Sequence, residues 1–369
     1  MNIANSVEEL VGSTPLLRLS KSLKNVPAGK WMLQEKKLLQ PFSLRGDILS
    51  KIEFMNPAGS TKDRIAIHMI NKAEQRGDLK AGATVIEATS GNTGAGLAMV
   101  AAKRGYKAIF VMPDKMSAEK INALRAFGAK VVIAPNDVAP TDSRSKYRVA
   151  ERLAKEIPNS FLANQYHNPD NPEAHYFSTG PEIWQQCEGK IDYFICGLGT
   201  GGTVSGIAKF LKEKNSKLKV IGIDPVGSLY YDLIKKEKNP SFKPYLVEGI
   251  GEDFVPSTIN LDLIDDCVYV SDEESFSATR MLAQEEGLLV GGSCGSAYYG
   301  GVQYLAWLES QGLTNYQAVI LLPDSGSRYL SKVFNDVWLK EKDISTRWNE
   351  LKLGAEVEYI EGAKPVPGV

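Results

Sequence analysis

Short apolar runs that alternate with longer amphipathic segments do most to limit the folds open to this chain. The apolar runs lack the every-second-residue polarity of half-exposed strands, and this pattern is typical of parallel strands covered on both faces. We predict strands at 84–88, 108–112, 130–134, 193–196, 220–224, 267–270 and 318–322. Helices are expected at 94–103, 118–127, 143–156, 173–188, 203–214, 272–286 and 296–311. The alternation indicates a doubly wound α/β protein.

Length and charge narrow the functional classes. A chain of 369 residues can bury a large core, and the length prior suggests about two domains. The formal net charge is −1, so no strong field attracts nucleic acid or an acidic membrane surface. No apolar run is long enough to cross a bilayer, and the segment 1–9 lacks the basic start and apolar stretch of a signal sequence. We expect a cytoplasmic protein with no nucleic-acid or membrane partner.

The cysteines and histidines are scattered along the chain. Cysteines occur at positions 187, 196, 267 and 294, and none of them forms a Cys-x-x-Cys pair. The three histidines, at positions 68, 167 and 175, do not cluster with them. We therefore predict neither a disulfide framework nor a metal site.

A turn rich in hydroxyl groups follows the first predicted strand of the alternating pattern. Residues 89–94 contain two threonines, a serine, an asparagine and two glycines, and a predicted helix begins at their end. Ligands in doubly wound folds bind at the carboxyl ends of strands. A helix N-terminus with free N–H groups suits a carboxylate or a phosphate. The alternative is a plain capped turn, because Ser, Thr and Asn are good N-caps.

A second turn, at 197–203, has four glycines and two threonines between a predicted strand and a predicted helix. Glycines let the backbone approach a phosphate closely, but dinucleotide sites look similar. The turn lacks the Gly-x-x-x-x-Gly-Lys-Ser/Thr pattern of nucleoside-triphosphate loops. Asp224 is the nearest candidate for a ribose ligand. A nucleotide-dependent oxidoreductase therefore stays an open alternative.

Lys62 follows a Gly-Ser-Thr turn at the start of a further predicted helix. A protonated amine is a poor nucleophile, and loss of water together with nearby positive dipoles lowers its pKa, so that it can form a Schiff base. The alternative is a solvated surface lysine, which is the common state of this residue type.

Taken together, these motifs resemble the β family of pyridoxal-phosphate enzymes (fold type II), which contains the cysteine synthases and the cystathionine β-synthases. The matching segments are 12–16, 56–64, 89–94, 199–203 and 291–296, in family order. Segments 247–256 and 323–332 resemble the cystathionine β-synthase branch more than the cysteine synthase branch. The resemblance implies two doubly wound α/β domains, with the smaller inserted in the larger and pyridoxal 5'-phosphate in the cleft between them.

The resemblance also implies the domain bounds. Residues 1–84 and 166–343 would form the large cofactor-binding domain, and 85–165 a small mobile domain that clamps the substrate. We interpret residues 31–46 as a surface loop and 344–369 as a tail too short for a regulatory domain. No cysteine precedes position 187 and no histidine precedes position 68, so the amino-terminal haem ligands of the animal enzymes have no counterpart. We expect no haem.

Site roles follow from the resemblance. Lys62 would hold the cofactor and remove the α-proton of the substrate, Asn92 would bind the ring hydroxyl, and Ser293 would face the ring nitrogen. The phosphate would lie on Gly199, Thr200, Gly201, Gly202 and Thr203. The substrate would contact Thr89, Ser90, Gly91, Thr93, Gln165, Gly249 and Glu252.

The implied reaction is β-replacement in a homodimer. Serine or an O-activated serine would lose its β substituent to give an aminoacrylate, and homocysteine would add to give cystathionine. Cysteine as the substrate would release hydrogen sulfide. The alternatives are a cysteine synthase that uses O-acetylserine and sulfide, and a non-catalytic binding platform.

Glu252 departs from the aromatic residue that the animal and fungal synthases carry at this place. Our hypothesis is that Glu252, with Asp253, pairs with the distal amino group of homocysteine or cystathionine. The alternative is a solvated loop acid.

Overall fold

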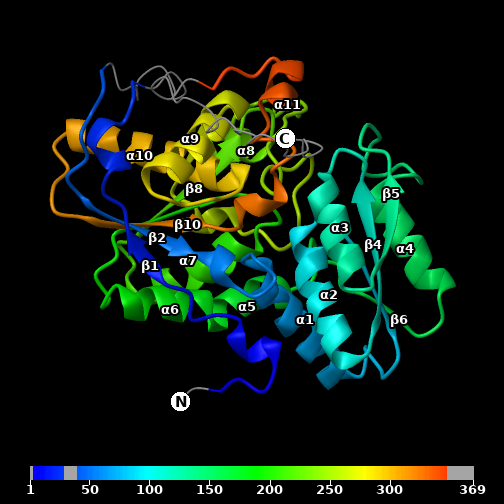
Figure 1. Cartoon of the computed structure of the whole chain (residues 1–369). Helices are drawn as coiled ribbons and strands as arrows, with labels where there is room; N and C mark the ends of the chain where they lie inside the picture. Colours follow the sequence, from blue (N-terminus) through cyan, green and yellow to red (C-terminus); the bar gives the residue numbers. More distant parts are fainter. Residues whose placement is uncertain (1–2, 29–39, 347–369) are drawn as a thin grey trace, which may run out of the picture.

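The computed structural model describes residues 3–28 and 40–346, and its strands form two separate sheets (Figure 1). The six-stranded sheet has the order β1-β2-β10-β7-β8-β9, and the four-stranded sheet has the order β5-β4-β3-β6. Every neighbouring pair of these strands is parallel except β1 and β2, which are antiparallel. The predicted doubly wound α/β class with parallel sheets is confirmed.

The larger sheet takes strands from both ends of the described chain. Its strands are β1 (Leu16–Arg18), β2 (Asp47–Ile52), β7 (Tyr193–Gly197), β8 (Lys219–Pro225), β9 (Asp266–Val270) and β10 (Gln317–Leu322). The smaller sheet is made from one continuous stretch, with β3 (Thr84–Ala88), β4 (Lys107–Pro113), β5 (Lys130–Ala134) and β6 (Ser160–Leu162). The smaller unit is therefore inserted in the larger one.

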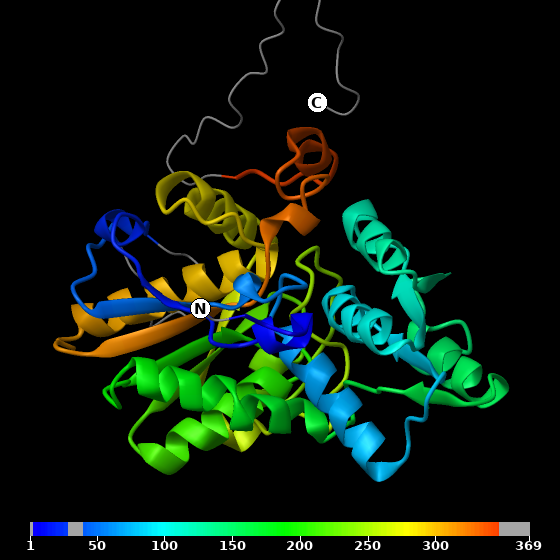
Figure 2. The ribbon, with the colours of Figure 1, turned by 60° about the horizontal axis from the view of Figure 1, so that its bottom comes forward.

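Helices cover both faces of each sheet (Figures 1 and 2). The longer ones are α1 (Lys62–Arg76), α2 (Asn92–Arg104), α3 (Ala118–Ala126), α4 (Lys146–Glu156), α5 (Asp170–Phe177), α6 (Thr179–Gln186), α7 (Gly202–Lys214), α9 (Asp272–Glu285) and α10 (Gly292–Ser310). Two short helices, α8 (Tyr230–Ile234) and α11 (Asp336–Glu341), lie in the connections near the C-terminal half.

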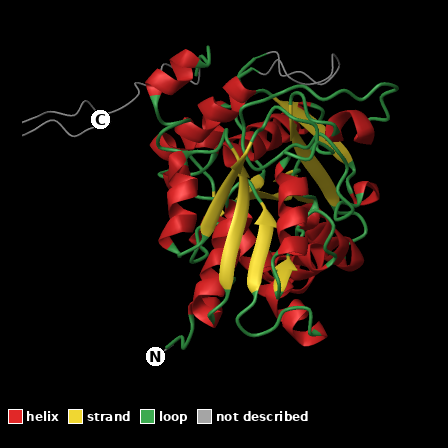
Figure 3. Cartoon of the chain, turned by 90° about the vertical axis from the view of Figure 1, so that its right-hand side faces the viewer, coloured by secondary structure: helices red, strands yellow, loops and turns green. Residues whose placement is uncertain are grey.

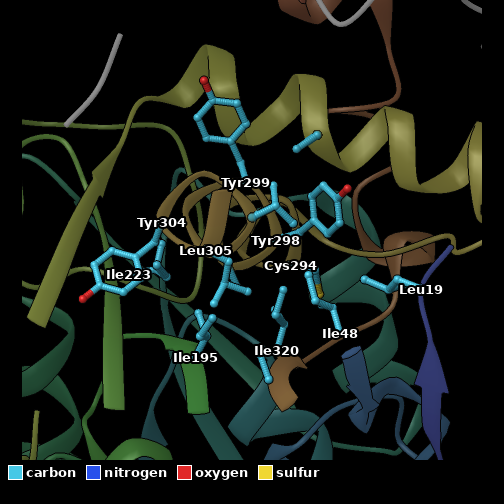
Figure 4. Close-up of a cluster of buried hydrophobic side chains, with 14 of the residues drawn as sticks. Leu19, Ile48, Ile195, Ile223, Cys294, Tyr298, Tyr299, Tyr304, Leu305 and Ile320 are labelled. Atoms are coloured by element: carbon cyan, nitrogen blue, oxygen red, sulfur yellow. The ribbon is translucent and has the colours of Figure 1, made fainter. Parts of the chain in front are cut away.

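Alternate residues of the central strands bury both faces of the larger sheet. Ile195 of β7 packs in the cluster that contains Tyr298 and Leu305 of α10 (Figure 4). Its neighbour Phe194 packs in a second cluster, with Ile207 of α7. The inner positions of β7 are apolar because neither face of the sheet meets water there.

The smaller sheet is layered in the same way (Figure 3). Val85 and Phe110 pack with α1, α2 and α3, whereas Ile86 and Val111 pack with α4 on the other face. Gly96 on α2 brings α2 close to α1, because a Cβ there would lie 3.0 Å from the Lys62 carbonyl oxygen. Helix α1 also contacts α5, which packs against α7 of the larger unit, so α1 lies between the two sheet units.

Two features of the fold differ from the predictions. Strands β1, β2 and β6 were not predicted. The single helix predicted at 173–188 is wrong, because α5 ends at Phe177 and α6 begins at Thr179. Pro181 lacks an N–H group and its ring would meet the carbonyl group of Phe177, so one unbroken helix cannot form there.

The structure also bears on the cysteines, on metal-ligand groups and membrane spans, and on the two segments that were interpreted as a loop and a tail. All four cysteines are free and buried. In the described ranges no group of His, Cys, Asp and Glu could hold a metal ion, and no helix is long and apolar enough to cross a membrane. The expected loop at 31–46 and the tail after residue 343 lie largely outside the described residues.

Candidate active site

A cavity of about 800 Å³ opens between the two sheets, at the carboxyl ends of their strands. Residues that follow β3, β7 and β10 line it together with the start of α1. Ten of the predicted site residues line this cavity: Lys62, Thr89, Ser90, Asn92, Thr93, Gln165, Thr200, Gly249, Glu252 and Ser293. Gly91, Gly199, Gly201, Gly202 and Thr203 are not part of the lining, and they shape the two loops behind it.

Lys62 is the first residue of α1, and the preceding turn fixes where its side chain begins. The Lys62 backbone N–H donates to Ser60 Oγ at 3.2 Å, and the Thr61 N–H donates to the Pro323 carbonyl at 2.8 Å. The Lys62 side chain is partly buried, and loss of water lowers the pKa of its amine, although the Asp324 carboxylate opposes this. A larger neutral fraction makes the amine a better nucleophile and base.

The glycine loop before α7 cannot accept larger residues. A Cβ on Gly201 would lie 2.2 Å from the Ile259 Cβ, and the φ angle of Gly201 is +84°. A Cβ on Gly202 would lie 1.9 Å from Asn171 Oδ1. Helix α7 has no side-chain cap and no acidic residue in its first turn, so its N-terminal N–H groups and its dipole are free for an anion.

Two side chains of α5 support this loop from behind, and sequence reasoning missed both. Asn171 Nδ2 donates to the Gln165 carbonyl at 2.8 Å and to Thr200 Oγ1 at 3.1 Å. His175 Nε2 lies 3.2 Å from Thr203 Oγ1, and burial lowers the pKa of this imidazole well below its usual range. The predicted helix began only at residue 173 and gave no sign that its polar residues point inward.

Asn92 is held by two residues that were not predicted to be in the site. Asn92 Nδ2 donates to Asp324 Oδ2 at 2.8 Å, and Asn92 Oδ1 accepts from Arg328 Nη1 at 2.7 Å. The second amide hydrogen of Asn92 remains for a ligand. Ser293, in the first turn of α10, is 3% exposed and supplies a hydroxyl to the same cavity.

The N-terminus of α2 forms a second place for an anion. Thr89 Oγ1 accepts from the N–H groups of Gly91 and Gly94, at 3.0 and 3.3 Å. Thr93 Oγ1 donates to Gln165 Oε1 at 2.6 Å. No acidic residue lies in the first turn of α2. These groups and the helix dipole suit a carboxylate.

A buried acid lies directly behind Gln165. The Gln165 backbone N–H donates to Glu87 Oε2 at 3.3 Å, and the Glu87 side chain comes from β3. Burial raises the pKa of the Glu87 carboxyl to about 8, and the hydrogen bonds from Gln165 only partly oppose this. Glu87 is therefore largely protonated at neutral pH. It sits at an inward position of an apolar strand, where sequence reasoning did not look for a site residue.

The cavity fits pyridoxal phosphate. The free helix end at α7 matches a phosphate dianion, the Lys62 amine matches an aldehyde, and the second anion site at α2 matches an amino-acid carboxylate. Thr61 Oγ1 lines the cavity and is buried without a hydrogen-bond partner among the described residues, which leaves a polar atom for a ligand beside Lys62.

Comparison with known proteins agrees with this fit. The family described as "Pyridoxal-phosphate dependent enzyme" matches residues 32–324. A cystathionine beta-synthase of Apis mellifera is 45% identical over 332 residues, which cover 90% of this chain. The chain spans 62% of the length of that relative.

Two solved structures are similar over most of their length. A hydrogen sulfide-producing enzyme of Fusobacterium nucleatum has a TM-score of 0.77 and 35% identity, and it covers 89% of this chain and 100% of its own. An O-acetylserine dependent cystathionine beta-synthase of Helicobacter pylori has a TM-score of 0.76 and 36% identity, with 90% and 99% coverage.

The family match covers all strands of both sheets except β1, and every loop that lines the cavity up to β10. Fold and cofactor therefore agree between the geometry and the relatives. The chain belongs to the pyridoxal-phosphate dependent enzymes of fold type II, the family that contains the cystathionine β-synthases.

Proposed function

We propose that this enzyme catalyses β-replacement on serine or an O-activated serine, with homocysteine as the thiol that gives cystathionine. The observation that carries the proposal is one cavity that combines the Lys62 amine and the Ser293 hydroxyl with two helix N-termini whose first turns lack acidic residues. The similarity to cystathionine beta-synthases supports the choice of products.

Four groups would hold the cofactor. The N-terminus of α7, with Gly199 to Thr203, would take the phosphate, and Asn92 would take the ring hydroxyl. Lys62 would hold the aldehyde carbon through its amine, and Ser293 would take the ring nitrogen. Pyridoxal phosphate, when bound, supplies an electron sink that weakens the bonds at the α-carbon of an amino acid.

Lys62 would also move the proton. The Lys62 amine would accept the α-proton of the substrate at Nζ, and its lowered pKa favours the neutral form that this role needs. The residues at the start of α2 and Gln165 hold the substrate carboxylate so that the Cα–H bond lies beside Lys62. Closure of residues 85–165 over the substrate would exclude water.

Ser293 favours this reaction class over transamination. A hydroxyl can hydrogen-bond a ring nitrogen, but unlike a carboxylate it cannot keep that nitrogen protonated. The electron sink is then weaker, which favours prompt departure of a β substituent over a long-lived carbanion.

Cysteine synthesis from O-acetylserine and sulfide is the second candidate, and hydrogen sulfide release from cysteine is a third. The Helicobacter pylori relative, described as O-acetylserine dependent, favours an acetylated donor. The Fusobacterium nucleatum relative, described as hydrogen sulfide-producing, favours release from cysteine.

An activity assay of the purified enzyme with four substrate mixtures distinguishes these reactions. The enzyme is mixed with serine plus homocysteine, with O-acetylserine plus homocysteine, with O-acetylserine plus sulfide, and with cysteine alone. The proposal predicts that a homocysteine mixture has the highest kcat/KM and yields cystathionine. Faster formation of cysteine from sulfide would contradict it.

The resemblance also supports a homodimer in the cytoplasm. Light scattering on the purified enzyme checks the first, with twice the 40.4 kDa chain mass expected. Fractionation of cells that express the tagged chain checks the second.

A further inference from the structure

The outer part of the cavity carries two opposite charges that come from different sheet units. Lys146 is the first residue of α4, which packs on the four-stranded sheet. Glu252 lies in the connection between β8 and β9 of the six-stranded sheet. Both side chains line the cavity, and both are half-buried. A ligand between the two sheet units would meet both charges.

Neither charge is compensated by an ion pair. Another acid of the same cavity, Glu248, pairs with Lys120 at 2.7 Å and with Lys332 at 2.6 Å. Within the described ranges, no ion pair joins Glu252 or Lys146 to any residue, although each lies in the electrostatic field of the other. The two groups are therefore close enough to interact but too far apart to touch.

The residues around the gap between Glu252 and Lys146 hold Lys146 in place. Lys146 Nζ donates to the Tyr166 hydroxyl at 3.2 Å. Tyr147, Tyr166 and Phe254 form an aromatic wall, with ring centroids 5.2 to 5.5 Å apart. Both units contribute to this wall, because Tyr147 lies on α4 and Phe254 follows Glu252. An ordered wall beside a fixed cation is a built surface for a ligand.

The electrostatics of the gap favour a ligand with both charges. Loss of water raises the pKa of the Glu252 carboxyl, and Lys146 opposes this rise. Loss of water lowers the pKa of the Lys146 amine, and Glu252 opposes that change. A cation placed on Glu252 and an anion placed on Lys146 would stabilise both charged forms.

We propose that Glu252 and Lys146 form a subsite for the free amino-acid end of the second substrate. Its ammonium group binds Glu252 and its carboxylate binds Lys146, while its thiol points inward to the reacting carbon. The inference rests on the proposed function and names its acceptor class: a thiol that is itself an α-amino acid. Hydrosulfide carries neither group and gains nothing from this subsite.

A series of four thiols tests each charge separately on the cofactor-loaded enzyme. Homocysteine carries both groups, 4-mercaptobutanoate lacks the ammonium, 3-mercaptopropylamine lacks the carboxylate, and hydrosulfide lacks both. Each KM is measured with a saturating donor for the wild type, Glu252→Gln and Lys146→Gln. Asp137→Asn and Lys155→Gln serve as controls, because both residues are exposed, Asp137 on the rim of the same cavity and Lys155 near the far end of α4.

Each variant is expected to raise the KM only for the thiols that carry the group it binds, which gives a crossed pattern over the two variants. Glu252→Gln raises the KM for homocysteine and mercaptopropylamine roughly ten- to hundredfold, the range expected when a hydrogen bond to a charged group is lost. It changes the KM for mercaptobutanoate and hydrosulfide less than about threefold. Lys146→Gln raises the KM for homocysteine and mercaptobutanoate, and spares the other two thiols.

An equal effect of either variant on all four thiols would overturn the inference, because the pair would then only hold the two units together. The inference would also be overturned if a control variant changed the KM values as much as the subsite variant of the same residue type. Calorimetric binding of cystathionine to the same variants gives a readout without turnover. If no donor is consumed with any thiol, the proposed function fails, whereas consumption without the crossed pattern defeats the subsite alone.

Discussion

Replacement of Glu87 by glutamine should change how stability depends on pH. Glu87 is 1% exposed, and burial raises the pKa of its carboxyl from 4.5 to about 8. The folded protein therefore holds this proton at pH values where the unfolded chain has lost it. Stability from this group is fully present below pH 4.5 and is lost as pH rises toward 8.

The size of the effect follows from the two pKa values. They differ by about 3.5, and each unit corresponds to 1.36 kcal/mol, which gives a full loss of up to ~5 kcal/mol. Between pH 5.5 and pH 8 the ionisation of this group lowers the free energy of unfolding by about 3 kcal/mol. Glutamine keeps the shape and an oxygen acceptor for the Gln165 N–H, but it does not ionise. The variant should therefore gain about 3 kcal/mol on the wild type over this range.

Urea unfolding at pH 5.5 and pH 8, with saturating cofactor, measures this gain. Other buried acids with raised pKa values, such as Asp63 and Asp224, are present in both proteins and cancel in the difference. Glu151→Gln is the control, because its side chain is 42% exposed, and its difference should stay within about 0.5 kcal/mol. A gain for Glu87→Gln that is the same at both pH values would refute the assignment of a protonated Glu87.

Three further substitutions test the supports of the site. Gly202→Ala should weaken cofactor binding tenfold or more in a titration followed by absorbance, because its Cβ would lie 1.9 Å from Asn171 Oδ1; unchanged affinity would contradict the close fit of this loop. Lys120→Met should lower stability by about 3 kcal/mol, because it removes a buried partner of Glu248. Lys332→Met should lower the free energy of unfolding by less, both measured by urea unfolding, since its side chain is 17% exposed against 1% for Lys120; equal losses would be evidence against this ranking.

Much of the fold was predictable because its strands are buried on both faces. Strand β7, for example, is a run of apolar residues whose length and flanking turns leave little choice. Strand β2 was missed because Ser50 and Lys51 are polar yet buried. Lys51 is tolerated there because Nζ donates to the Thr14 carbonyl at 2.6 Å and to Glu182 at 2.9 Å. Those partners are distant in sequence, and no local pattern shows them.

The site also divides into residues marked by a local sequence pattern and residues whose partners are distant in sequence. The places of Lys62 and of the turns at 89–94 and 197–203 beside the cavity were predictable, because each is a local motif at the end of a strand or the start of a helix. Glu87, Asn171 and Asp324 were not, because each acts through a partner brought close only by the fold. Lys146, for which we propose a ligand-binding role, was not predicted, because a lysine at a helix start has no sequence signal that separates such a role from a solvated one.

Chemical trapping tests the central claim most directly. Borohydride reduction of the cofactor-loaded enzyme, followed by digestion and mass spectrometry, locates the lysine that carries the pyridoxyl group. The account predicts that the peptide with Lys62 carries it, and that Lys62→Ala loses both the label and the visible absorbance band. A label on another lysine in the wild type, or turnover by Lys62→Ala at the wild-type rate, would contradict it.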